Sequence, residues 1–384
     1  MKTAYKFIVL LGIVSLFADM TYEGARSITG AYLAVLGANA AIVGTVVGFG
    51  EFLGFGLRFI SGYFADRTQK YWFITIAGYV VNLFAVPLLA LTGSWQIAAA
   101  LIILERVGKS IRIPARDAML SHASESVGMG RGFGLHQMFD QIGAMLGPFV
   151  VAGVLFFNHN YQIAFGVLLI PAIFALITLY FARMRYPNPH ELIVNTYSEE
   201  APIPKHRFKL FLIGSALLAL GFSDFPLIAY HFQKIHLFIP VMIPVAYGVA
   251  MGIDAISAPL IGHLYDKAGL IILIIAIIFT AFFAPLVYLC SATYAFMGVI
   301  LWAIGMGVQD SLLRSIVGKM TPAGKRGSAY GLFNLIYGAF WFIGSAFSGI
   351  LYDRSIIILV YFIIITQFLA VPFFISVIKL QRRV

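Results

Sequence analysis

Residues 62–70 read Gly-Tyr-Phe-Ala-Asp-Arg-Thr-Gln-Lys, a short polar turn between two long apolar segments. Residues 262–269 repeat the pattern 200 positions later as Gly-His-Leu-Tyr-Asp-Lys-Ala-Gly: a glycine, three residues, an aspartate and then a base. Each copy separates the second apolar segment of one half of the chain from the third. Two such turns predict a duplicated membrane protein.

The composition supports the same conclusion. Of 384 residues, 61% are hydrophobic and 11% are charged, against about 25% charged in soluble domains. The net charge of +10 sits in short connectors rather than on a soluble face, which argues against a nucleic-acid partner. The single cysteine, Cys290, excludes a disulfide framework and a thiolate metal cluster.

Twelve apolar runs have the length of about 20 residues that a membrane-spanning helix needs. A membrane barrel would show alternating segments of about ten residues instead. The sequence therefore predicts an all-α membrane protein with spans at 5–32, 40–63, 72–93, 97–118, 132–157, 161–183, 208–233, 239–261, 269–290, 294–317, 328–351 and 355–379.

The basic residues predict the orientation of these spans, because cytoplasmic connectors are enriched in Lys and Arg. Eighteen of the 26 bases fall on the side of the two chain ends, and two, Lys234 and Arg354, fall on the other side. Both termini are therefore expected in the cytoplasm. We expect an integral protein of the plasma membrane, which in a bacterium is the inner membrane.

A polar, proline-containing connector near the midpoint divides the chain. The expected division is residues 1–184 as one six-helix bundle, 185–206 as a cytoplasmic linker and 207–384 as a second bundle. Three glycines, Gly108, Gly134 and Gly147, recur 197 positions later as Gly305, Gly331 and Gly344. Asp19 and Asp224 are expected at similar depths in the first helix of each half. Such pseudo-symmetric repeats are typical of transporters.

The turn at 62–70 resembles the signature of the major facilitator superfamily between its second and third helices, and the resemblance extends over the whole chain. Gly62, Asp66 and Arg67 match the signature, whereas Gln69 replaces a usual glycine and Tyr71 a second base. The resemblance implies the major facilitator fold of twelve transmembrane helices in two pseudo-symmetric six-helix bundles.

The same resemblance implies a gate. Asp66 would face a neighbouring helix terminus, and Arg67 would pair with Asp117 at the cytoplasmic end of the fourth helix. Asp266 would repeat the arrangement in the second half. These contacts would hold one conformational state closed. The alternative is that Asp66 and Arg67 only cap their helix and stay solvated.

The fifth helix resembles the motif that the family associates with antiporters. Gly134, Gly143 and Gly147 are followed by Pro148, with the closing glycine pair reduced to Ala152 and Gly153. Small residues at this spacing also let helices pack closely, which is the alternative explanation.

Ionisable residues within the spans are candidates for function, because burying a charge in a bilayer is costly. We predict Asp19, Glu23, Glu51 and Glu105 as proton-coupling acids. The alternative is permanent pairing, such as Glu23 with Arg26 or Glu105 with Lys109. His136 and His231 are weaker candidates that more often serve helix packing.

Arg26, Lys109 and Arg112 are suited to bind an anionic group of a substrate. Polar and aromatic side chains of three other helices complete the predicted substrate site: Asp140, Asp224, Asn334, Tyr337 and Trp341. The resemblance places helices 1, 4, 7 and 10 around a central cavity. In helices 1 and 4, three acids against four bases leave the sign of the substrate's charge open. His136 with Asp140 is too little to predict a metal site.

The sequence thus predicts a proton-coupled secondary active transporter that moves a small organic solute by alternating access. The direction that we expect is efflux by antiport. Its partners are protons, the solute and the lipid bilayer, and a monomer is expected. The alternative is a proton symporter for uptake of a small anionic metabolite. A membrane-embedded enzyme or a non-transporting receptor is a remote third class, since no nucleophile–base pair, phosphate-binding loop or soluble domain is evident. No cofactor and no metal are predicted.

Overall fold

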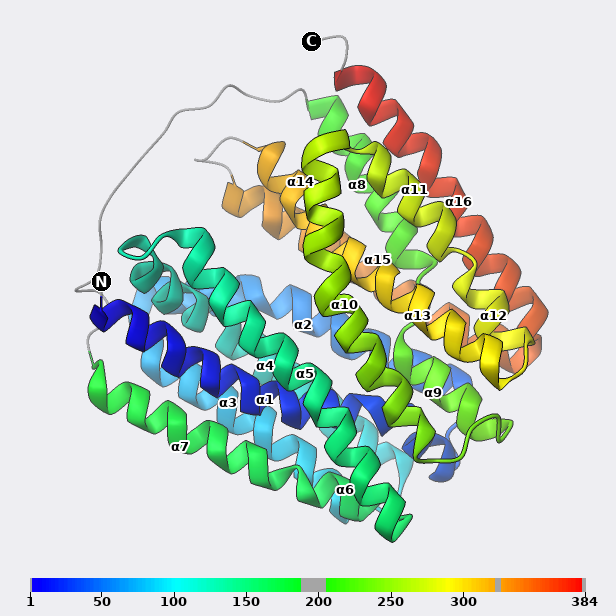
Figure 1. The fold of residues 1–384 in the computed structure, drawn as a ribbon, viewed down its shortest axis with the longest axis horizontal. Coiled ribbons are helices and arrows are strands. Elements are labelled where there is room, and N and C mark those ends of the chain that lie inside the picture. Colours follow the sequence, from blue (N-terminus) through cyan, green and yellow to red (C-terminus); the bar gives the residue numbers. More distant parts are fainter. Residues whose placement is uncertain (1, 188–204, 322–325, 382–384) are drawn as a thin grey trace. The chain divides into compact units, whose positions relative to one another are not determined.

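The structure, a computed structural model, describes residues 2–187, 205–321 and 326–381 (Figure 1). Most of the connector predicted as the linker, residues 185–206, lies outside the described residues. Within them the chain folds into helices, and no strand is found. The all-α prediction is confirmed.

Twelve helical segments coincide with the twelve predicted spans. Eight of these segments contain a single α-helix as their main element: α1 (Lys2–Val35), α2 (Ala40–Thr68), α3 (Tyr71–Leu88), α4 (Trp95–Glu125), α5 (Met129–Asn158), α10 (Met242–Ala268), α15 (Arg326–Arg354) and α16 (Ile356–Gln381). The other four are interrupted: α6 (Tyr161–Val167) with α7 (Leu169–Arg185), α8 (Lys205–Leu220) with α9 (Phe225–Lys234), α11 (Ile271–Thr280) with α12 (Phe283–Leu289), and α13 (Ala292–Val308) with a π-helical turn (Gln309–Leu313) and α14 (Arg314–Lys319).

Eleven of these segments are long and apolar enough to cross a membrane, counted over the described residues. The twelfth is α4, whose 31 residues are long enough. Its ionisable side chains, including Glu105, Lys109 and Arg112, make it the most polar of the spans. Glu105 and Arg112 are buried and Lys109 is partly buried within the fold, so this face of α4 points away from lipid.

The break between α8 and α9 changes the prediction for Asp224. The sequence suggested a continuous helix with Asp224 pointing inward from its middle. Instead Asp224 is the N-cap of α9, and its Oδ1 accepts a hydrogen bond of 2.8 Å from the backbone N–H of Phe225. The indole N–H of Trp302 donates to the carbonyl of Ser223 at 2.8 Å, which satisfies one carbonyl that the break leaves without a helical partner.

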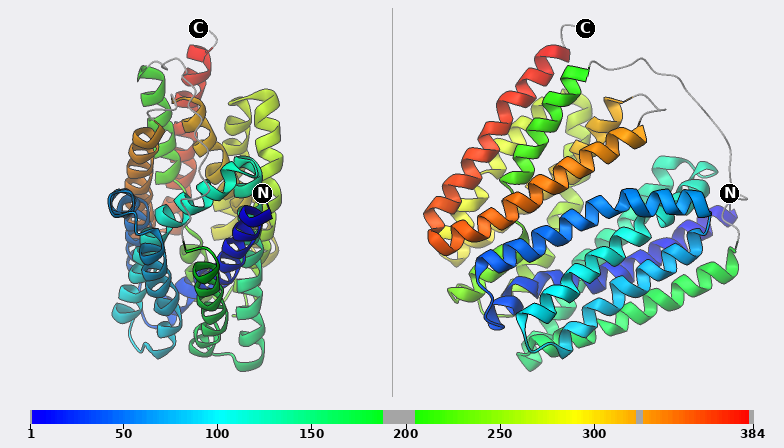
Figure 2. Two further views of the ribbon diagram at one scale, coloured as in Figure 1. Left: turned by 90° about the vertical axis from the view of Figure 1, so that its left-hand side faces the viewer. Right: turned by 180° about the vertical axis from the view of Figure 1, so that it is seen from behind.

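The described chain forms two compact units. Unit 1 comprises residues 1–37, 53–196 and 239–248. Within it α1 packs along α5, α3 along α4, and α7 along α1 (Figure 2). Gly147 makes the first contact possible, because a Cβ there would collide with the backbone oxygen of Met20 and lie 2.9 Å from the backbone nitrogen of Gly24. Gly143 meets the backbone oxygen of Leu16 in the same way.

Unit 2 comprises residues 38–52, 197–238 and 249–384. Within it α8 packs against α15 and α16, and α12 against α13. Gly344 lies against the backbone oxygen of Leu220 on α8, just as Gly147 lies against Met20 on α1. The two contacts therefore confirm the internal repeat. They also align Met20 with Leu220, so that the counterpart of Asp19 in the repeat is Ala219.

The two polar turns share an unusual backbone conformation. Gln69 has φ of 57° and Gly269 has φ of 69°, both in the left-handed region. The position of Gln69 thus needs the conformation that the family's usual glycine adopts without cost. A hydrogen bond of 2.6 Å from its side-chain Nε2 to the carbonyl of Asp66 helps to hold Gln69 there.

Replacing Gln69 tests this account of the turn. We expect Gln69→Gly to leave the protein as stable as wild type or to stabilise it by up to about 1 kcal/mol, because strain is relieved while unfolded-state freedom rises. Gln69→Val should destabilise it by about 1–2 kcal/mol, because a β-branched side chain strongly disfavours positive φ. Thermal unfolding of the purified variants measures their order of stability. A Gln69→Val variant as stable as Gln69→Gly would contradict this account of the turn.

Candidate functional site

The buried charges of unit 1 gather where α1, α3, α4, α5 and the start of α10 meet. Asp19 and Glu23 come from α1, and Glu105, Arg106 and Arg112 from α4; each is at most 9% exposed. The structure thus brings together several residues that the sequence singled out. Close glycine contacts of α1 with α5 and of α3 with α4 fix the backbones that carry them.

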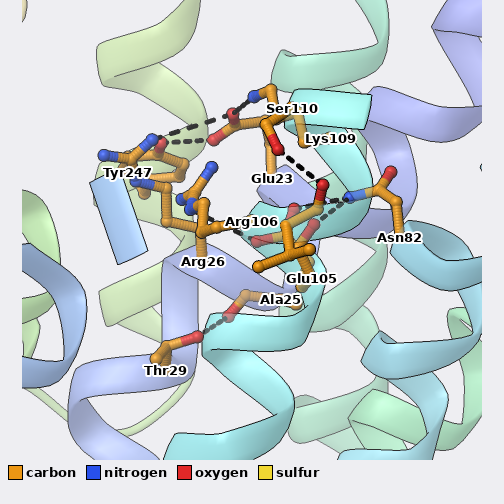
Figure 3. Close-up of polar contacts among 11 residues, drawn as sticks. Glu23, Ala25, Arg26, Thr29, Asn82, Glu105, Arg106, Lys109, Ser110 and Tyr247 are labelled. Carbon is orange, nitrogen blue, oxygen red and sulfur yellow. Dashed lines mark hydrogen bonds and ion pairs between the residues drawn. The ribbon is translucent and has the colours of Figure 1, made fainter. Parts of the chain in front are cut away.

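Glu23 is the centre of one group of contacts (Figure 3). The hydroxyl of Tyr247 donates a hydrogen bond of 2.6 Å to its Oε2. Its Oε1 lies 3.8 Å from Nζ of Lys109 and 4.0 Å from Nη1 of Arg26. Glu23 therefore has three partners in this structure, and Arg26 is among them, as in the alternative that the sequence analysis gave for this acid.

Glu105 is also fully engaged. Nδ2 of Asn82 donates to Oε1 of Glu105 at 2.7 Å and to its backbone carbonyl at 3.1 Å (Figure 3). Nε of Arg106 lies 3.2 Å from Oε2 of Glu105. The ion-pair partner of Glu105 is thus its neighbour Arg106, whereas Lys109 forms its ion pair with Glu23. A tight contact makes this possible, because a Cβ on Gly108 would collide with the backbone of Asn82.

A second chain of contacts runs from α4 across α1 to α5. Nη1 of Arg116 donates to Oγ of Ser15 at 3.1 Å, and that oxygen lies 3.1 Å from Nε2 of His136. Nδ1 of His136 lies 3.4 Å from Oδ2 of Asp140. These contacts link Arg116, Ser15, His136 and Asp140 in one buried polar chain.

Asp19 lies between these two groups. It is 6% exposed, and within the described residues its carboxylate makes no hydrogen bond and no ion pair. It interacts electrostatically with Asp140, Lys109 and Arg112. A Cβ added to Gly143 would lie 3.0 Å from the Cβ of Asp19, so the base of the Asp19 side chain packs against α5.

Arg112 faces the same region from α4. Its side chain is fully buried, with Cζ 4.2 Å from the ring centre of Tyr79 and 5.6 Å from that of Tyr22. Nζ of Lys109 lies 3.9 Å from the Tyr22 ring centre. Within the part of the chain that the structure describes, Nε and Nη1 of Arg112 have no hydrogen-bond partner. Among the described residues, the region thus holds an acid with no hydrogen bond or ion pair and a guanidinium group with two nitrogens that lack a hydrogen-bond partner.

The residues predicted for the gate are engaged in other contacts. Nη1 of Arg67 donates to the Tyr63 hydroxyl at 3.3 Å, and Asp117 accepts from Arg116 at 2.7 Å. The expected pair of Arg67 with Asp117 is not among the contacts of the described residues. Tyr71, which stands where the family has a second base, is within hydrogen-bonding reach of Asp66.

The equivalent turn of unit 2 makes an ion pair of its own. Oδ1 of Asp266 lies 2.9 Å from Nζ of Lys319 at the end of α14, and both side chains are exposed. An exposed pair of this kind contributes little to stability. It is therefore a weak surface contact.

The remaining predicted residues lie in unit 2. The hydroxyl of Tyr337 donates to Oε1 of Gln309 at 2.8 Å, and Glu51 interacts electrostatically with Tyr337. The ring centre of Trp341 lies 5.6 Å from that of Phe222. Asn334 is half-buried on the same helix.

Several contributing residues were not predicted from the sequence: Ser15, Asn82, Arg116, Tyr247 and Gln309. All five are polar side chains in apolar runs, but many others of that kind are not in the site. Tyr247 and Glu23 are 224 positions apart, so that only the fold reveals their contact.

Replacing Tyr247 tests the importance of the Glu23 contact. Tyr247→Phe removes the 2.6 Å hydrogen bond and keeps the ring. Because a bond to a charged acceptor contributes about 1.5–3 kcal/mol, we expect a loss of stability of that size. A double-mutant cycle with Glu23→Gln measures the coupling. Additive effects of the two substitutions would contradict the contact.

These features define a class of protein: a polytopic helical membrane protein with an internal repeat and a buried charge network in its first half. The sequence profile described as Major Facilitator Superfamily matches residues 10–345. The chain belongs to the major facilitator superfamily. It is a secondary transporter and not an enzyme.

Individual relatives agree with this assignment. An uncharacterized protein of Mycobacterium tuberculosis is 40% identical over 375 residues, covering 96% of this chain and 92% of the relative. An uncharacterized MFS-type transporter of Methanocaldococcus jannaschii is 26% identical over 361 residues, covering 91% of this chain and 89% of the relative.

Solved structures share the fold at low sequence identity. The nucleoside transporter NupG superposes with a TM-score of 0.77 at 14% identity, covering 96% of this chain and all of that chain (100%). A peptide transporter, POT, solved with sulfate also gives 0.77 at 14% identity, covering 98% of this chain and 94% of that chain. At this identity the likeness concerns the fold alone.

Proposed function

We propose that the protein is a proton-coupled secondary active transporter that moves a small organic solute across the membrane by alternating access. The observation that carries the proposal is the state of Asp19. It is buried and makes no hydrogen bond or ion pair within the described residues, yet it interacts with Asp140, Lys109 and Arg112. A carboxyl in such surroundings can take up or release a proton when a neighbouring charge arrives or moves.

Two of the other predicted acids, Glu23 and Glu105, are less suited to this role. Glu23 has Tyr247, Lys109 and Arg26 as partners, and Glu105 is held by Asn82 and Arg106. Protonating either acid would break several contacts at once. We therefore assign the proton to Asp19, with Asp140 as its acidic neighbour, and assign Glu23 and Glu105 to the positioning of α1, α3 and α4.

The proposal includes a gate at the two polar turns. Residues 1–184 and 207–384 would move as the two halves, and the turns would exchange partners during that movement. The ion pair of Asp266 with Lys319 is exposed, and exposed pairs are weak. Such contacts can break and reform at low cost. Arg67 would then meet Asp117 in a different state from the one described above.

The direction of transport is the finer part of the proposal. Export by antiport is suggested by the resemblance of the fifth helix to the antiporter motif, although Gly143 and Gly147 are also required for the packing of α5 on α1. Uptake of a small anionic metabolite by symport is the second candidate. It is favoured by the unpartnered nitrogens of Arg112. We place both termini in the cytoplasm, on the distribution of bases, and propose a monomer in the plasma membrane.

Two steps test the proposal. Thermal-shift screening of the purified protein against metabolites, drugs and siderophores identifies a solute, since a ligand that binds the folded state stabilises it. Liposomes that contain the protein and a pH-sensitive dye then report proton movement when that solute is added. We expect proton movement that requires the solute. Protons that move in the same direction as the solute indicate symport, and protons that move in the opposite direction indicate antiport. Solute flux with no proton movement would refute the coupling.

A further inference from the structure

Arg112 is held in place by the backbones around it. A Cβ on Gly78 would lie 2.6 Å from the backbone nitrogen of Arg112 and 2.7 Å from its Cβ, so α3 and α4 are in direct contact there. Its guanidinium carbon then lies over the ring of Tyr79 and, at a greater distance, over that of Tyr22. The guanidinium group therefore has a fixed position, and its orientation is set before any ligand arrives.

A buried cation of this kind is costly unless an anion compensates it. The aromatic faces of Tyr79 and Tyr22 offset part of the cost. They do not accept the hydrogen bonds of Nε and Nη1, which have no partner within the described residues. Because each of these nitrogens can donate a charge-assisted hydrogen bond to an oxygen of a carboxylate or phosphate, this arrangement suits an anionic ligand.

Lys109 supplies a second cation one turn away on the same helix. Its Nζ lies over the Tyr22 ring at 3.9 Å, and its side chain is 19% exposed, whereas Arg112 is fully buried. Lys109 is therefore the more accessible of the two cations. The pair of Lys109 with Glu23 is long, at 3.8 Å, and Glu23 retains Tyr247 if Lys109 turns to another anion.

The charged groups around Arg112 come from three helices. Those on α1 are Asp19, Glu23 and Arg26, those on α5 are His136 and Asp140, and α4 itself adds Glu105, Arg106 and Arg116. Of the acids among them, Glu23, Glu105 and Asp140 have ion-pair or hydrogen-bond partners. Asp19 has no such partner within the described residues. No ion pair joins it to Arg112, so its carboxylate oxygens lie more than 4.0 Å from the guanidinium nitrogens.

We propose that Arg112 and Lys109 bind the anionic group, carboxylate or phosphate, of a small solute, and that Asp19 holds a proton while this group is bound. This inference rests on the proposed proton-coupled transport. An anion next to Asp19 disfavours a second negative charge, so the anion and the proton each strengthen the binding of the other. Such positive coupling favours symport, whereas a cationic solute would compete with the proton and favour antiport.

The test uses the full-length protein in phosphatidylcholine nanodiscs. Thermal shift is measured with lactate, succinate, citrate and inorganic phosphate, and with ethanolamine and glycerol as cationic and neutral controls. Calorimetry in two buffers of different ionisation enthalpy then counts the protons taken up with the best anion. Nanodiscs with phosphatidylglycerol form a separate arm, which distinguishes a lipid headgroup from a free solute.

We expect at least one anion to stabilise the wild-type protein and to bind with proton uptake. Arg112→Gln should weaken that binding by about 10- to 100-fold, the effect of losing charge-assisted hydrogen bonds. Asp19→Asn should bind the anion at least as tightly as wild type but without proton uptake. Arg183→Gln, which removes an exposed base of α7, is the matched control and should bind like wild type.

Other outcomes overturn the inference. Stabilisation by ethanolamine or glycerol but not by anions would refute an anion site. If ethanolamine binding also releases protons, the proposed proton-coupled transport would still be supported. Stabilisation by phosphatidylglycerol alone would assign the site to a lipid. Anion binding without proton uptake would refute coupling at Asp19 and with it the proposed function. If Arg112→Gln does not fold, Arg112→Lys is used, and wild-type affinity in that variant would refute the role of Arg112.

Discussion

Asp19→Asn is expected to abolish accumulation of the solute against its gradient while leaving solute exchange intact. The substitution keeps the size of the side chain but removes its capacity to bind a proton. A gradient of about one pH unit supplies about 1.4 kcal/mol per proton, which supports an accumulation of about tenfold. With the variant, we expect the solute concentration inside the liposomes to rise only to the concentration outside. Uptake into liposomes with and without a pH gradient, and exchange at equal pH, measure both properties.

Glu125→Gln is the matched control for this experiment. It removes an exposed acid at the end of α4 and should accumulate the solute like wild type. Accumulation by Asp19→Asn at the wild-type level would refute the assignment. A loss of both accumulation and exchange would also contradict it, because the account gives Asp19 no role in holding the fold.

Gly147→Ala is expected to destabilise the protein by about 3 kcal/mol or more, the upper range for overpacking. The added methyl group would collide with the backbone oxygen of Met20 and approach the backbone nitrogen of Gly24 to 2.9 Å. Backbone atoms cannot rotate away as a side chain can, so α1 and α5 would have to separate. The yield of monodisperse protein and its thermal unfolding temperature measure the effect.

Gly134→Ala on the same helix is the matched control. No atom lies within 4 Å of the position of its added Cβ, and the replacement favours the helix by up to about 1 kcal/mol. Gly344→Ala, against Leu220, should behave like Gly147→Ala if the repeat is structural. Equal stabilities of the Gly134 and Gly147 variants would show that α1 and α5 do not pack as described.

Much of the fold could be predicted because it depends on local composition. Apolar runs of sufficient length located the spans, and the repeated turns indicated the duplication. Interruptions within spans were harder to predict. The residues around Asp224 are as apolar as those of an unbroken helix, and the break is stabilised by contacts such as that from Trp302.

The site was predictable only as a set of buried charges. Spacing along one helix correctly placed His136 beside Asp140, because residues four apart share a face. Spacing cannot reveal which helices meet, so Ser15, 121 positions from His136, was not found. The distinction between the acids was also hidden. Glu23 and Asp19 are equally plausible from sequence, and only the packed structure shows that Glu23 is paired while Asp19 is not.

The most direct test of the central assignment is infrared difference spectroscopy of the purified protein over the pH range in which it transports. It records the carboxyl groups that change protonation and requires no assumption about the solute. We predict a carboxyl band that titrates in the wild type and in Glu23→Gln and is missing in Asp19→Asn. A titrating band that persists unchanged in Asp19→Asn, or one that disappears in Glu23→Gln, would contradict the account.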